Sequence, residues 1–407
     1  MHRRLEPRGA AGEKAVLLAE EHARELAAHV GERDRAGLLD RACFQKMADS
    51  GLLGACVPEE LGGLGVTYLQ DVAAVVNRIG YADAGMALAV HMHLGRQWYV
   101  ARRWTWGTGA ERAEFGAVLT AMGSGAMVAP GAASEAGTDW DHVLTEATEV
   151  DGGYLLNGRK TFVTLSAIAT HFHIRARVPA GDGWEMASVR VDGSSPGVTV
   201  VPDWDAMGMR TSGSNDVVLT DVFVPTEAVS RRGTWGEPQP GTDEQRTVSA
   251  IGLQGAFLGG AEAARDFAVA KAAKGDRHPH SRRPSGLVHV LGEMDVRLMA
   301  ARATLERALA VVDDGVAGRA SGTVPAEVAT DMMVAFQCAK DVVTHTAIDM
   351  VNRAMTVVGG GGFMSAHPLS RIYRDMRAGP LMQPYAPLEA MDFIGTVAID
   401  RITRKTP

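Results

Sequence analysis

The sequence predicts an α+β chain in which a helical domain precedes a β-domain and a helical bundle follows it. Three observations predict this order: helical apolar spacing before about residue 125, short strands over about 126–235, and long helices after a Gly/Pro-rich linker at 231–242. A chain of 407 residues exceeds one ordinary core. We therefore expect three domains, at 1–125, 126–235 and 240–407.

The N-terminal domain is predicted from apolar residues that recur at helical spacing. In EKAVLLAEEHARELAAHV, one face of the expected helix collects Val16, Leu17, Ala23, Leu26 and Val30. Clustered glycines in VPEELGGLGV (57–66) indicate a loop. Further helices are expected through Leu69–Ile79 and Ala84–Tyr99.

The middle domain is predicted from short alternating runs without helices between them. HFHIRARV alternates apolar residues at Phe172, Ile174, Ala176 and Val178, as a strand with one buried face would. EMASVRV, GVTVV and DVVLTDVFVP continue the series. Asn157-Gly158 stands between two apolar runs and predicts a hairpin turn. A small sandwich or barrel follows from this pattern.

The C-terminal domain is predicted as a four-helix-like bundle with long helices over 244–273, 286–314 and 325–357. Pro325 suits the first turn of the last of these helices. The run Gly359–Gly362 ends that helix, because consecutive glycines are costly inside a helix.

The bulk composition excludes several classes of protein. Hydrophobic residues at 46% and charged residues at 22% are typical of soluble globular chains. A net charge of −7 gives no support for a nucleic-acid partner, and no window is apolar enough to span a membrane. The three cysteines are far apart and match no metal spacing, so we predict a reduced, cytoplasmic protein without a metal site.

Five strings, taken in order along the chain, resemble motifs of the acyl-CoA dehydrogenase superfamily. They are VPEELGGLG (57–65), SEAGTD (134–139), NGRKTFVT (157–164), MGMRTSGSNDVVLTDVFVP (207–225), and AMTVVGGGGF with the following RIYRD (354–375). No single string is specific, but their shared order covers nearly the whole chain. The resemblance implies the fold of that family, with an N-terminal helical domain, a middle β-domain and a C-terminal four-helix bundle.

The resemblance also implies an FAD cofactor and a homotetramer or homodimer. Carried over by motif, Phe162 packs on the flavin ring, Thr164 hydrogen-bonds near its N5, and Ser134 approaches its pyrimidine edge. Gly359 and Gly360 would lie against the cofactor of a neighbouring subunit. An aromatic residue and a threonine two positions apart on one strand share a face, as a flavin slot requires. Without the flanking strings, the same residues describe an ordinary strand and a helix cap.

Two cofactor motifs of the family are altered. The family has Gln just before its glycine run, where this chain has Thr356. Its Arg-x-x-Phe-Gly signature is replaced by KGDRHPHSRRP (274–284), in which Arg282 or Arg283 is the candidate to meet the pyrophosphate.

The catalytic base of the family is also missing. In an acyl-CoA dehydrogenase a Glu removes the α-proton of a thioester, and counting from the Arg-Asp pair places that position at Gln383. One branch carries its Glu just before an Arg of the first C-terminal helix; here that Arg is Arg246 and the preceding residue is Gln245. An amide has almost no proton affinity at neutral pH, and losing a positioned base costs roughly 10²–10⁴-fold in rate.

Three hypotheses follow from the missing base. The leading one is a flavin-dependent monooxygenase that acts on a small metabolite or acyl thioester through a C4a-peroxyflavin, with Gln383 as a hydrogen-bond donor and a separate reductase as partner. The alternative is an acyl-CoA or acyl-carrier-protein dehydrogenase with a displaced base. A non-catalytic flavin-binding subunit is the third. The candidates for a displaced base are Glu244, Glu389 and Asp392. The candidates for contact with the substrate are Asp139 and Arg246.

Overall fold

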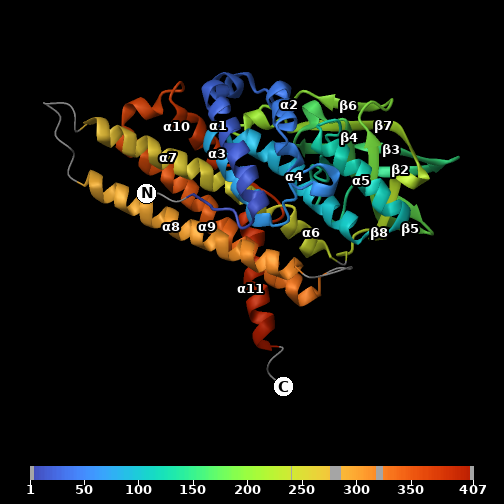
Figure 1. The fold of residues 1–407 in the computed structure, drawn as a ribbon. Coiled ribbons are helices and arrows are strands. Elements are labelled where there is room, and N and C mark those ends of the chain that lie inside the picture. The colour runs from blue at the N-terminus through green and yellow to red at the C-terminus, as the bar shows by residue number, and fades with distance from the viewer. Residues whose placement is uncertain (1–3, 240, 276–285, 318–323, 404–407) are drawn as a thin grey trace.

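The computed structural model describes residues 4–239, 241–275, 286–317 and 324–403. Figure 1 shows three regions: a group of N-terminal helices in the middle, a β-domain on one side, and long C-terminal helices on the other. This is the α+β order that the sequence predicts. The boundaries proposed for the three domains remain predictions.

The N-terminal region is helical up to Gly123. Its helices are α1 (Ala10–Ala36), α2 (Arg41–Asp49), α3 (Leu69–Ala82), α4 (Ala84–Trp106) and α5 (Gly109–Gly123). In α1 the predicted face is buried at Val16, Ala23, Leu26 and Val30, but Leu17 is 63% exposed. Helix α3 is buried almost throughout and packs on α1 and on C-terminal helix α7 (Gln254–Gly275).

Eight strands form one hydrogen-bonded sheet in the order β6-β7-β3-β2-β4-β5-β8, with β1 paired to β4. The strands are β1 (Gly131–Ala132), β2 (Glu146–Val150), β3 (Gly153–Val163), β4 (His171–Ala180), β5 (Gly183–Asp192), β6 (Val198–Val201), β7 (Asn215–Pro225) and β8 (Val229–Thr234). Strands β5 and β7 also touch, although three strands separate them in the order, so the sheet curls over its own core. Phe172, Ile174, Ala176 and Val178 lie in that core, as their alternation predicts.

The predicted hairpin turn at Asn157-Gly158 is wrong, because both residues lie inside β3 at an irregularity in its pairing with β7. Asn157 exchanges two hydrogen bonds of 2.9 Å with Asp221 on β7, which fixes the distortion across the strands. A Cβ on Gly158 would lie 2.3 Å from the Thr145 hydroxyl oxygen, so glycine is needed for close packing rather than for a turn.

The C-terminal region contains α6 (Thr242–Val248), α7, α8 (Leu287–Val316), α9 (Ala326–Val358), α10 (Pro368–Met376) and α11 (Pro387–Thr403). The stretch predicted as one helix over 244–273 is broken, since a short 3₁₀ turn at Ile251–Leu253 separates α6 from α7. Pro325 precedes the first residue of α9, and Gly359 ends that helix with φ 77°. Figure 1 shows α11 extending away from the body, and Ala390 is its only buried residue.

A buried polar junction joins the three regions. Arg371 on α10 forms an ion pair with Asp375 at 3.0 Å and donates to the carbonyl of Ala82 at the end of α3. Asp375 in turn accepts from the backbone N–H of Met209 in the β-domain. This Arg-Asp motif therefore fixes the α10 end of the bundle against the other two regions.

No helix in the described ranges is both long enough and apolar enough to cross a membrane. Among the same residues there is no group of three metal-ligating side chains, and Cys43, Cys56 and Cys338 are unpaired thiols.

Candidate active site

The first part of the site is the irregular end of β3. Phe162 has φ 56° and Leu165 has φ 70°, left-handed conformations that are uncommon for bulky side chains. Pairing with β7 is irregular between Lys160 and Val163, and Phe162 is 68% exposed whereas Thr164 is 9% exposed. The two side chains therefore do not share a face as regular alternation predicts. The distortion instead exposes the Phe162 ring at the surface, where its centre lies 6.2 Å from the centre of the Trp204 ring.

Three hydroxyl groups gather at the residues that follow β3 and precede β7. The Thr164 hydroxyl lies 2.9 Å from that of Ser214, which lies 2.7 Å from that of Ser212. A flavin needs a flat apolar surface and a few hydrogen-bond donors along one edge. Phe162, Thr164 and Ser214 supply both, so these residues fit a bound flavin. The motif pointed to Thr164; Ser214, within the string SGSN, was missed because only the fold joins it to Thr164.

Two contacts hold the loop that carries Ser134 against β3. The Ser134 carbonyl accepts a 2.9 Å hydrogen bond from the Thr161 N–H. The next residue, Glu135, forms a buried ion pair with Lys160 and accepts from the Thr145 hydroxyl at 2.6 Å. Burial lowers the pKa of Lys160 to about 8 despite the attraction of Glu135. The ion pair and the hydrogen bond from Thr161 therefore fix Ser134 next to the end of β3, and its contact with the flavin edge stays a prediction.

Asp139 organises a turn. Its carboxylate accepts 2.9 Å hydrogen bonds from the N–H groups of Asp141 and His142, and lies 2.8 Å from the His142 ring. These bonds orient the intervening residue, Trp140. Since the carboxylate of Asp139 is engaged within the turn, its effect on substrate would act through the placement of Trp140.

Gln383 is exposed in a bend between α10 and α11. The bend is held by Lys340 of α9, which is 3% exposed and donates from its Nζ to the carbonyls of Met382 and Tyr385. The Tyr385 ring lies 5.7 Å from the guanidinium of Arg246 on α6. The fold thus brings the Gln383 bend next to the helix that carries Gln245 and Arg246. Gln383 and Gln245 are the two positions at which the family carries its catalytic Glu.

Two of the three candidate displaced bases have structural roles. Glu244 accepts from the Val324 N–H, just before α9, and Glu389 accepts from the Ala386 N–H at the start of α11. Asp392 is an exposed residue of α11. Sequence reasoning missed another carboxylate, Asp243, whose charge interacts with Arg246 and Tyr385. Burial raises the pKa of Asp243, against the attraction of Arg246.

The predicted cofactor contacts near the end of α9 are all exposed. Thr356 donates its hydroxyl to the Asn352 carbonyl within the helix. A Cβ added to Gly359, Gly360 or Gly361 would meet nothing within 4 Å of this chain, so their packing inside the chain does not require glycine. Close approach by a group from outside this chain would explain a run of glycines at this exposed position. Arg282 and Arg283 lie outside the described residues.

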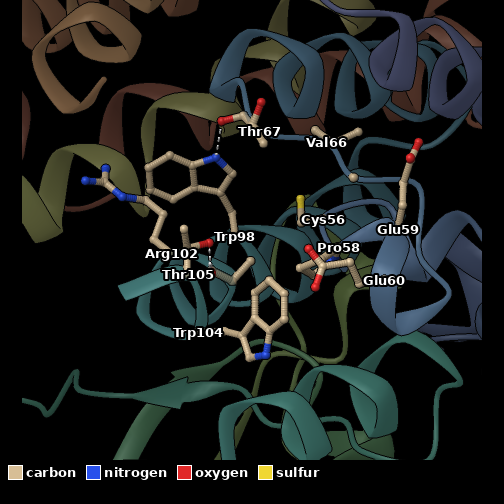
Figure 2. A pocket seen from close by; sticks show the side chains of 12 residues that line it. Cys56, Pro58, Glu59, Glu60, Val66, Thr67, Trp98, Arg102, Trp104 and Thr105 are labelled. Carbon is tan, nitrogen blue, oxygen red and sulfur yellow. Dashed lines mark hydrogen bonds between the residues drawn. The ribbon is translucent and has the colours of Figure 1, made fainter. Parts of the chain in front are cut away.

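A cavity of about 380 Å³ lies in the N-terminal region (Figure 2). In Figure 2 the Trp98 indole N–H points to the Thr67 carbonyl at 2.8 Å, Arg102 lies beside it, and Glu59 and Glu60 lie across the cavity. None of the predicted flavin or substrate residues lines this cavity. It is therefore separate from the site at the β3 end.

Models of the acyl-CoA dehydrogenase N-terminal, middle and C-terminal domains match residues 17–125, 131–222 and 251–382. An amino sugar nitrososynthase, DnmZ, from Streptomyces peucetius is 38% identical over 97% of this chain and 95% of its own. The crystal structure of a nitrososynthase from Micromonospora carbonacea var. africana has a TM-score of 0.90 and 37% identity, covering 98% of this chain and 99% of its own. KijD3, solved with FMN and dTDP-3-amino-2,3,6-trideoxy-4-keto-3-methyl-D-glucose, has a TM-score of 0.89 and 35% identity, covering 97% and 95%.

Proposed function

The chain belongs to the acyl-CoA dehydrogenase family and is a flavin-dependent oxidoreductase, and on that basis we propose that it oxygenates the amino nitrogen of an amino sugar. The observation that carries this proposal is the amide at position 383. A family enzyme that removes an α-proton needs a carboxylate at one of two positions, and this chain has the neutral amides Gln383 and Gln245 at both. Gln383 stands in a bend that Lys340 holds and that adjoins Arg246. The identity of 38% to an amino sugar nitrososynthase over nearly the whole chain supports the same choice.

When bound, a reduced flavin supplies two electrons and activates O₂, so that each cycle forms one N–O bond and releases one water. Two cycles convert a primary amine first to a hydroxylamine and then, with loss of a further water, to a nitroso group. The electrons must come from a separate flavin reductase, which we propose as the partner.

The residues of this chain bind and orient in this mechanism. Phe162 offers its ring to one face of the flavin, and the Thr164 and Ser214 hydroxyls are the donors for its edge. Gln383 can donate a hydrogen bond to the substrate or to reduced oxygen without competing as a base. Lys340 keeps that amide in place by holding the backbone on both sides of it.

The family resemblance predicts FAD, and the flavin-bound relatives support a flavin cofactor. Whether this flavin is FAD or FMN is decided by experiment. KijD3 was solved with FMN. The mass of the flavin released from purified protein by heat distinguishes FMN from FAD.

The direct test combines the protein with a flavin reductase, NADH and O₂, and offers amino sugars with and without a nucleotide. We expect oxygen-dependent conversion to hydroxylamine and nitroso products, with ¹⁸O from labelled O₂ on nitrogen. Anaerobic bleaching of the flavin by an acyl thioester, with no nitrogen oxidation in air, would overturn the proposal.

The dehydrogenase remains the second candidate because of Asp243. This carboxylate is half-buried near Arg246 and Tyr385, and its raised pKa, caused by burial, is a property expected of a displaced base. Its role is tested by Asp243→Asn: if the protein dehydrogenates thioesters, this variant should lose roughly 10²–10⁴-fold in the rate of flavin reduction by thioester.

We also propose that the protein is a homotetramer or homodimer. Large apolar side chains at the end of the glycine run and on α11 are exposed, with Phe363 at 80%, Leu388 at 83% and Ile402 at 71%. Such groups are typical of surfaces covered by another chain. Light scattering should give a mass at least twice that of one chain, and Phe363→Asp should shift it toward the monomer.

A further inference from the structure

Three polar side chains are buried on the face of α9 that lies against the Gln383 bend. Gln337, Lys340 and Thr344 are three and four residues apart, so their side chains are neighbours along one side of the helix. Their exposed fractions are 0%, 3% and 0%. The inner face of a helix in a bundle is usually apolar. A buried polar face on α9 therefore needs a reason beyond the packing of the bundle.

The bend packs closely on this face and leaves a small cavity. A Cβ on Gly379, just before the bend, would lie 2.8 Å from the Thr344 methyl carbon and 3.1 Å from the Phe257 ring. The remaining space, of about 10 Å³, is close to what one water molecule occupies. Its lining includes the three polar residues of α9 together with Pro380, Pro387 and Ala390.

Two oxygen atoms beside this cavity lack a hydrogen-bond partner. Gln337 Oε1 and Thr344 Oγ1 are buried, and no group within the described ranges bonds to either. The amide nitrogen of Gln337 donates only to the Met333 sulfur, at 3.3 Å, which is a weak acceptor. A buried oxygen without a partner costs free energy, so these two point to a small donor in the cavity.

Lys340 offers a matching N–H group. An ammonium group carries three N–H donors, and the carbonyls of Met382 and Tyr385 take two of them. Burial lowers the pKa of Lys340 to about 8, against the attraction of Glu389 and Asp341. An acceptor for the third N–H would stabilise the charged form, which binds the two carbonyls more strongly than a neutral amine would.

We infer that Gln337, Lys340 and Thr344 form a water site, and that one internal water molecule bound there keeps Lys340 in place to position Gln383. The water accepts from Lys340 and donates to the Gln337 and Thr344 oxygens, and three bonds are usual for a buried water. The cavity is too small for a larger ligand. Gln337 and Thr344 are thus positioning residues that act through Lys340, and their effect on the reaction rests on the proposed function.

Hydrogen exchange of the backbone amides in the bend, measured by mass spectrometry on the flavin-loaded protein, tests the water site without a substrate. Thr344→Val keeps the shape of the side chain and removes the hydroxyl. It should accelerate exchange in the bend by about 3- to 10-fold, as expected for loss of one neutral hydrogen bond. Thr344→Ser keeps the hydroxyl and should exchange more slowly than Thr344→Val. Lys340→Met should exchange fastest, with retained flavin as its folding check.

Thr330→Val is the matched control. Thr330 lies on the same helix, and its hydroxyl donates to the Ala326 carbonyl at 2.9 Å, so this variant should leave exchange in the bend unchanged. The inference is overturned if Thr344→Val exchanges as the wild type does. It is also overturned if Thr344→Ser exchanges as fast as Thr344→Val, because the methyl group and not the hydroxyl would then matter. A crystal structure that orders other buried waters but none bonded to these three residues would overturn it as well.

Kinetics with the same variants separate this inference from the proposed function. If the protein oxygenates amino sugars, Thr344→Val should lower kcat by about 3- to 10-fold and release more of the reducing equivalents as hydrogen peroxide. A wild-type kcat in Thr344→Val would overturn the positioning role. The expected order of exchange rates in a protein that oxidises no amine would remove the proposed function and support the water site.

Discussion

Gly85, at the start of α4, packs tightly against the loop that carries part of the flavin site. One methyl group added at Gly85 should push this loop away from α4. A Cβ there would lie 2.2 Å from the Thr211 hydroxyl oxygen and 3.1 Å from the Thr211 nitrogen. Thr211 belongs to the loop that carries Ser212 and Ser214, and its hydroxyl donates to Asp83 at 2.6 Å. Gly85→Ala must therefore move this loop by about 1 Å before atoms reach ordinary contact.

The cost can be estimated from two contributions. Overpacking a tight site costs about 1–3 kcal/mol, and losing the hydrogen bond to the buried Asp83 carboxylate costs about 1.5–3 kcal/mol. We expect Gly85→Ala to destabilise the protein by roughly 2.5–6 kcal/mol. Because the loop also places Ser214 behind Thr164, flavin should bind about tenfold more weakly through the loss of one well-placed donor.

The assay is thermal unfolding together with flavin titration of the stripped protein. Gly292→Ala is the control: Gly292 is an exposed residue of α8 and a Cβ there meets nothing within 4 Å, so the substitution should be neutral or slightly stabilising. Gly85→Ala with Thr211→Ala should recover part of the loss, since the clashing oxygen is gone. If Gly85→Ala unfolds at the wild-type temperature and binds flavin equally well, the contact between α4 and the loop does not position the site.

Three other predictions concern the base, the buried ion pair and acid stability. Gln383→Glu should raise anaerobic flavin reduction by acyl thioesters by at least ~100-fold, measured by stopped-flow bleaching, if position 383 is the seat of the base; no gain would contradict that alignment. Lys160→Met should cost about 3–5 kcal/mol in unfolding free energy, because it leaves Glu135 buried without its partner, whereas Lys160→Met with Glu135→Gln should recover most of it; equal stability of both variants would contradict this. Burial raises the pKa of Asp313 to about 6, so the folded state binds its proton more tightly than the unfolded state and stability falls as pH rises from about 4 to 6. Relative to Asp313→Asn, the wild type should lose about 2–3 kcal/mol over that range in urea unfolding, and parallel pH profiles would refute the assignment.

The sequence predicts the order of the domains well because the residue patterns that indicate helices and strands are local. Helical spacing and strand alternation are properties of neighbouring residues, so the buried face of β4 was correct at Phe172 and Ile174. Asn157-Gly158 was wrong for the same reason. Local preference favours a turn there, but hydrogen bonds to Asp221, which lies far along the chain, hold the pair inside a continuous strand.

The site was predictable only where a motif carried it. Phe162 and Thr164 belong to one string, yet the left-handed backbone that exposes one and buries the other depends on pairing with β7. Trp140 and Arg175 gave no signal in sequence, since a cation above an indole exists only after the Asp139 turn meets β4. Lys340 also gave no signal in the sequence, although its Nζ holds the Gln383 bend by donating to the carbonyls of Met382 and Tyr385.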